Sequence, residues 1–178
     1  MKNNSNDLKK PRAGFNVSMY SSGIFYVKCF DKDGKLKWED TAKNAVTAEG
    51  LNHVLDVEFH AETQITTWYI GLIRDDSYST LAAGDTLASH AGWQEGDEYT
   101  GDRKEWTEGA AAAGVMTNGS SVNFAINDTE TMKGAFLCSA ESGTSGILYC
   151  TALFTQGDRA VVSGDTLKVT YTITNAAA

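Results

Sequence analysis

The sequence has little proline and no long apolar run. Pro11 is the only proline among 178 residues, which argues against a long stiff linker. No apolar run approaches the roughly 20 residues that a membrane helix needs, and no apolar segment follows the N-terminal lysines as in a signal peptide. We therefore expect no membrane partner and synthesis in the cytoplasm.

Cysteine is scarce, and its spacing predicts no metal site. Cys29, Cys138 and Cys150 form no Cys-x-x-Cys pair. A turn centred on Thr144 would place Cys138 opposite Cys150 in a strand ladder, so a disulfide is conceivable in an oxidising compartment. In a reducing cytosol we expect small buried thiols instead.

Histidine is equally scarce, with three residues in the chain. His53 and His60 lie seven residues apart on a predicted helix, which separates them by ~10 Å, too far for one metal ion. Asp56 lies between them, so a two-ligand site is geometrically possible, but a solvated polar face is the interpretation we favour. We predict no metal and no cofactor.

Familiar catalytic motifs are also missing. The chain contains no Gly-x-Ser-x-Gly elbow, no phosphate loop and no dinucleotide glycine pattern. Carboxylates do cluster in the middle of the chain, at Asp75, Asp76, Glu95, Asp97 and Glu98. Nearby aromatic residues could stack on a sugar, namely Trp93, Tyr99 and Trp106. Acidic loop residues are usually solvated, so we predict no enzyme and keep carbohydrate contact by these aromatics as an alternative.

Charge is distributed unevenly along the chain. The net charge is −8, yet residues 1–12 carry +3 and the other 166 residues carry −11. Such an acidic body is a poor partner for nucleic acid. The basic start contains Lys2, Lys9, Lys10 and Arg12. It is either a solvated, frayed terminus or an arm that reaches an acidic neighbour, such as another copy or a shell.

Hydrophobic alternation predicts a mainly β protein with about eight strands. Asp31–Gly34 reads as a hairpin turn between the first two strands. The last strand alternates apolar and polar residues, so one of its faces is wet. Nine segments show a strand-like pattern, and they cover 23–30, 35–39, 66–73, 102–106, 121–126, 132–138, 146–154, 160–162 and 166–173.

One helix is predicted over residues 47–60, with Thr47 as N-cap and Glu49 in the first turn. Its apolar stripe consists of Leu51, Val54, Leu55 and Phe59. The stripe must pack on something, and the run Trp68–Ile73 is apolar on both faces, as in a central strand. We expect the helix to lie over this run, with Gly71 at the close contact, and to form an inert interior.

The predicted architecture is a two-sheet antiparallel sandwich, jelly-roll-like, with one covering helix at about 47–60. Residues 1–13 would be a flexible basic arm, and residues 14–178 a single domain. A loop-rich insertion at about 74–120 would be either functional or mobile.

Two parts of the sequence resemble virion structural proteins of tailed bacteriophages. The first contains Asn44–Thr47, Glu49–Asn52, Leu55–Val57, Phe59 and Thr67–Ile73, and the second is the ending Arg159–Ile173. The similarity covers roughly 44–73 and 132–175, about two-fifths of the chain. Among such proteins, the nearest in character are capsid decoration, or cement, proteins with a jelly-roll-like body.

This resemblance implies a non-enzymatic protein that binds the outside of a phage head and stabilises it through inter-subunit contacts. The implied partners are the major capsid protein and further copies of the chain, as a dimer or trimer. The implied location is the capsid surface of the virion, after synthesis in the host cytoplasm. Lys2, Lys9, Lys10 and Arg12 would belong to a capsid-contact arm.

The alternative is a carbohydrate- or receptor-binding module of a phage fibre or tail. It would use Trp93, Tyr99 and Trp106, at least two of which must then be exposed and coplanar.

Overall fold

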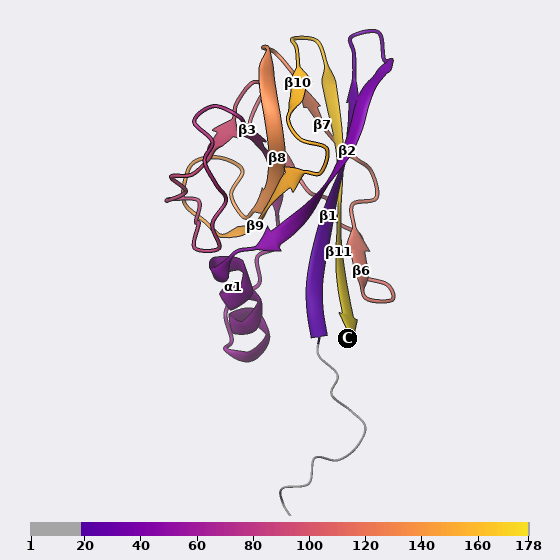
Figure 1. Cartoon of the computed structure of the whole chain (residues 1–178). Helices are drawn as coiled ribbons and strands as arrows, with labels where there is room; N and C mark the ends of the chain where they lie inside the picture. The colour runs from indigo at the N-terminus through magenta and orange to yellow at the C-terminus, as the bar shows by residue number, and fades with distance from the viewer. Residues whose placement is uncertain (1–18, 178) are drawn as a thin grey trace, which may run out of the picture.

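The computed structural model describes residues 19–177 (Figure 1). Within this range the chain forms eleven strands and one helix, and all strand pairs are antiparallel. The prediction of a mainly β, antiparallel protein with one helix is therefore confirmed. The helix is α1 (Ala48–Phe59). The strands are β1 (Met19–Phe30), β2 (Leu36–Val46), β3 (Tyr69–Arg74), β4 (Gln94–Gly96), β5 (Lys104–Glu105), β6 (Val115–Thr117), β7 (Val122–Ala125), β8 (Glu130–Cys138), β9 (Leu148–Phe154), β10 (Arg159–Val161) and β11 (Thr166–Ala177).

These strands form one continuous hydrogen-bonded sheet in place of two separate ones. Its order is β4-β3-β8-β9-β2-β1-β11-β6, with β5 beside β3, β7 beside β11 and β10 beside β8. Strand β2 joins the two halves because Leu36–Lys43 pairs with β1 while Ala42–Val46 pairs with β9. Both halves contribute side chains to one main core, which includes Phe25 of β1 and Ile70 of β3.

The alternation of the last strand produces the predicted half-buried face. Leu167, Val169 and Tyr171 of β11 are buried, whereas Lys168 between them is exposed. The ring of Tyr171 stacks on Phe25 of β1 at 4.1 Å. Pairing along β1 and β11 thus builds the centre of the main core.

Strand β3 is buried on both faces, as its sequence predicts. Ile70 and Leu72 belong to the main core, while Ile73 belongs to a second cluster with Leu87, Trp93, Phe136, Cys138 and Leu148. Gly71 faces Phe136, because a Cβ built there would lie 2.2 Å from that ring. The layer over this second face comes from the loops after β3, so the prediction that the helix covers the strand is wrong.

The loop-rich stretch after β3 is held down by two buried polar side chains. Arg103 donates to Glu95 (2.6 and 2.7 Å) and to the carbonyl oxygens of Ala140 and Gly143 (both 2.9 Å). Asp85 accepts from the Trp93 indole at 2.9 Å. The stretch 74–120 is therefore fixed to the rest of the domain by these hydrogen bonds. The stretch itself contains the short strands β4, β5 and β6.

The three cysteines are free and buried. A register shift between Leu137 and Cys138 pairs Leu137 with Cys150 and places Cys138 opposite Leu148. Cys138 lies in the second cluster and Cys150 in the main core. The expectation that the two cysteines face each other is therefore wrong by one residue, and a one-residue shift puts a side chain on the other face of a sheet.

Candidate interaction surface

Helix α1 is attached to the body through its first turn. The amide of Gly50 donates to the Thr47 hydroxyl at 3.0 Å, so Thr47 is the N-cap as predicted. The amide of Thr47 donates to the Tyr149 carbonyl at 3.0 Å, and that of Ala48 donates to the Ala83 carbonyl at 2.7 Å. The Glu49 carboxylate accepts from the Leu148 amide at 2.8 Å. These contacts fix the start of α1 on the beginning of β9.

Gly50 makes this attachment close. It is buried, and a Cβ at this position would lie 2.4 Å from the carbonyl oxygen of Tyr149. Further along the helix, the His53 ring packs edge-on against Trp68 at 5.8 Å, and Trp68 packs against Tyr149 at 5.7 Å. The side of α1 that carries Gly50 and His53 is thus the side that contacts the body.

The apolar stripe of α1 is exposed. Leu51 is 53% exposed, Val54 49%, Leu55 55% and Phe59 80%. Successive residues of an α-helix are rotated by about 100°, so Leu51, Leu55 and Phe59 point away from the side that contacts the body. Val54 lies between the two sides, because it is rotated by only about 40° from Gly50. In Figure 1 α1 extends beyond the start of β9 instead of lying across β3.

The sequence identified the right four residues but assigned them to the wrong environment. An apolar stripe of period 3.6 predicts that a helix buries that stripe, without identifying what covers it. Here the absence of a side chain at Gly50 lets the helix backbone approach β9, so the face that carries Gly50 packs on the body in place of the stripe. We name Leu51, Val54, Leu55 and Phe59 the α1 stripe.

The surroundings of the α1 stripe are acidic. Residues 44–73 contain no lysine and no arginine. Four carboxylates lie on or just after the helix, at Glu49, Asp56, Glu58 and Glu62. His60 lies 3.5 Å from Asp56, and both side chains are at least half exposed. Across residues 19–177, no group of three or more His, Cys, Asp or Glu side chains has a geometry that could hold a metal ion.

The aromatic residues of the alternative hypothesis are core residues. Trp93 is 2% exposed, Tyr99 5% and Trp106 2%. The Trp106 indole donates to the Tyr171 carbonyl at 3.1 Å, and Tyr99 packs edge-on against Phe124 at 4.8 Å. The expectation that two of them are exposed is wrong, because the loops that carry them fold back onto the sheet and bury large rings.

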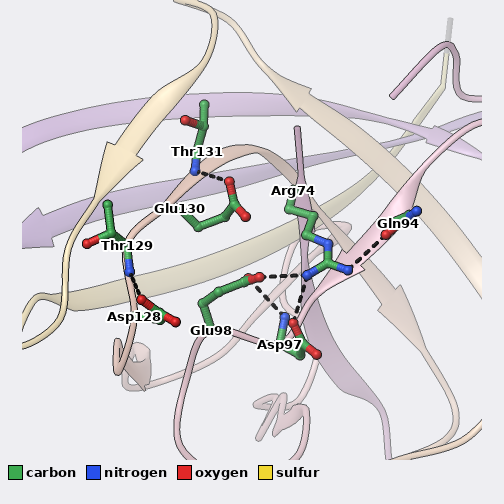
Figure 2. A network of polar contacts seen from close by, with 8 residues as sticks. All are labelled: Arg74, Gln94, Asp97, Glu98, Asp128, Thr129, Glu130 and Thr131. Atoms are coloured by element: carbon green, nitrogen blue, oxygen red, sulfur yellow. Dashed lines mark hydrogen bonds and ion pairs between the residues drawn. The ribbon is translucent and has the colours of Figure 1, made fainter. Parts of the chain in front are cut away.

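Four of the five clustered carboxylates are paired with a cation, namely Asp75, Glu95, Asp97 and Glu98. Figure 2 shows the guanidinium of Arg74 donating to Asp97 at 2.9 Å, to Glu98 at 2.7 Å and to Gln94 at 2.8 Å. The hydrogen bond from Arg74 to Glu98 raises the pKa of Arg74 above its ordinary value. The positive charge of Arg74 thus pairs with the negative charges of Asp97 and Glu98.

Other acidic residues near this network make separate contacts. Glu95 accepts from Arg103, and Asp75 accepts from Lys133 at 2.7 Å. In Figure 2 Asp128 and Glu130 accept from the next residue's amide, at 2.7 and 2.6 Å. The ion pairs of Glu95 and Asp75 therefore link loop residues to other parts of the domain.

The predicted capsid-contact residues Lys2, Lys9, Lys10 and Arg12 lie outside the described residues. Within the described part of the chain, no helix has the length and apolar character needed to cross a membrane. Neither protein-family models nor curated proteins give a match to this chain.

Proposed function

We propose that this chain is a non-enzymatic virion structural protein, a capsid decoration protein that binds the outside of a tailed-phage head. The proposal is supported by the α1 stripe: four large apolar side chains, each about half exposed or more, on one face of a short helix. Exposed apolar patches of this kind mark surfaces that bind other proteins. The protein would act by adhesion between subunits.

A capsid offers many identical binding sites, so a small apolar patch such as the α1 stripe is enough to stabilise the shell. A decoration protein meets its neighbours at many symmetric positions, so modest contacts add up across the lattice. The acidic body fits a partner that is protein and disfavours nucleic acid. The sugar-binding alternative has no support from Trp93, Tyr99 or Trp106, which are buried, and we do not propose it.

Co-sedimentation with expanded phage capsids tests this function. We expect the full-length protein to sediment with the capsids and Leu55→Gln to bind about tenfold more weakly, since an exposed leucine that becomes buried contributes on the order of 1.5–3 kcal/mol. Leu36→Gln is the matched control, because Leu36 is 44% exposed at the hairpin end of β2, away from α1. We expect this control to bind like the wild type.

Two results would count against the proposal. Failure of the wild-type protein to bind any expanded capsid would refute the decoration role. Equal binding by wild type and Leu55→Gln would mean that the α1 stripe does not contribute to capsid binding.

A further inference from the structure

The α1 stripe faces away from the copy that carries it. Gly50 and His53 contact the body. Leu51, Leu55 and Phe59 lie on the opposite side of the helix, and Val54 lies at the border between the two sides. A segment of the same copy would have to pass around the helix to reach Leu55 or Phe59. The orientation therefore favours an occupant that comes from a neighbouring molecule.

The size of the stripe favours a short chain segment over a second globular surface. A helix of 12 residues is ~18 Å long, which an extended chain spans with about five or six residues. A stable dimer usually buries roughly 20–30 residues on each side, far more than four side chains provide. Pairing of α1 with α1 of another copy would also bring Asp56 and Glu58 close to their own equivalents.

The negative charge around the α1 stripe favours a positively charged partner. Residues 44–73 carry four carboxylates and no lysine or arginine, whereas residues 1–12 carry +3. The N-terminal segment also interleaves apolar residues with its cations: Leu8 precedes Lys9 and Lys10, and Phe15 and Val17 follow Arg12. Its composition thus complements both the apolar stripe and the acidic border.

We propose that the α1 stripe binds the N-terminal segment, residues 1–18, of a neighbouring copy. Leu8, Phe15 and Val17 supply the apolar side chains that cover the stripe, and Lys9, Lys10 and Arg12 lie beside Asp56, Glu58 and Glu62. This inference rests on the proposed function, because a shell brings copies together, and it identifies the segment that links them.

Zero-length carbodiimide cross-linking of the concentrated full-length protein tests the inference. The reagent joins a lysine amine to a carboxylate only when the two are in contact. We expect a dimer band on a denaturing gel, whose peptides join Lys9 or Lys10 to Asp56, Glu58 or Glu62. We expect Leu55→Gln to reduce this band about tenfold and Leu36→Gln to leave it unchanged.

Charge exchange makes the test specific. Glu58→Lys and the double change Lys9→Glu/Lys10→Glu should each weaken the dimer band, and their combination should restore it. Glu108→Lys adds the same charge at an exposed position outside the helix and should have no effect.

The outcomes separate the inference from the proposed function. The predicted linkages in the dimer band support the inference. The same linkages confined to the monomer band would place the segment on its own copy and overturn it, as would their absence. Capsid binding that persists without these linkages would leave the decoration role standing and refute only the segment's place on α1.

Discussion

At the scale of single residues, buried polar groups in this protein stabilise turns. Asp85 and Asp165 occupy the same position in the two Gly-Asp-Thr-Leu stretches, and each accepts from the amide three residues earlier, at 2.9 Å. Asp165 also pairs with Lys37, whereas Asp85 accepts from Trp93. The repeated tetrapeptide predicts a turn that leads into a strand at each position. Both copies form the turn, but only the second leads into a strand, β11, whereas the first is followed by an isolated bridge between Thr86 and Ser89. Neither buried partner could be inferred from four letters.

Burial of the thiols is expected to make the protein less stable at alkaline pH. Burial raises the pKa of Cys29 to about 12 and the pKa values of Cys138 and Cys150 to about 11, from 9.0. Above pH 9.0 the unfolded chain releases thiol protons that the folded chain retains, so the free energy of unfolding is expected to fall as pH rises from about 9 to about 11.

Urea unfolding at several pH values measures this effect. The fall should be smaller in Cys138→Ala, in which one of the three thiols is missing, although buried tyrosines with raised pKa values, such as Tyr171, keep part of it. A free energy of unfolding that stays constant across this pH window would contradict the account.

At the scale of elements, the sequence predicted the existence of α1 and not its orientation. The same hydrophobic pattern fits a helix that covers a sheet and a helix that offers its stripe to another molecule. Strands were predictable where alternation or double-sided burial was strong, as in β11 and β3. Two strands of three residues each, β4 and β6, were missed because so short a segment shows no period.

Because the α1 stripe is exposed, we expect substitutions of its apolar residues to leave the stability of the isolated protein nearly unchanged. We expect Leu55→Gln to change the free energy of unfolding by no more than about 0.5 kcal/mol, since exposed positions rarely exceed this and glutamine is a good helix former. Leu137→Ala on β8, where the leucine is buried, should cost about 2–5 kcal/mol.

Denaturant unfolding of both variants gives the comparison. A loss of several kcal/mol in Leu55→Gln would mean that the stripe is buried in the isolated protein, and the interaction surface would then have to be sought elsewhere.

At the scale of the whole molecule, the exposed apolar side chains concentrate on one element. Four of the ten large apolar side chains that are exposed among the described residues lie on α1. The loops after β3 cover one face of the sheet, and the cations Arg74, Arg103 and Lys133 hold the acidic loops in place. Sequence alone could not distinguish these loops from a binding site, because acidic and aromatic residues suit both roles. The α1 stripe, with its acidic border, is the largest group of exposed apolar side chains on a single element of the described chain, and it directs the account toward assembly.

A cryo-electron microscopy reconstruction of capsids carrying this protein tests that claim most directly. The account predicts protein density from a neighbouring molecule over Leu51, Val54, Leu55 and Phe59 in every bound copy. A bound copy whose α1 stripe faces solvent would contradict it.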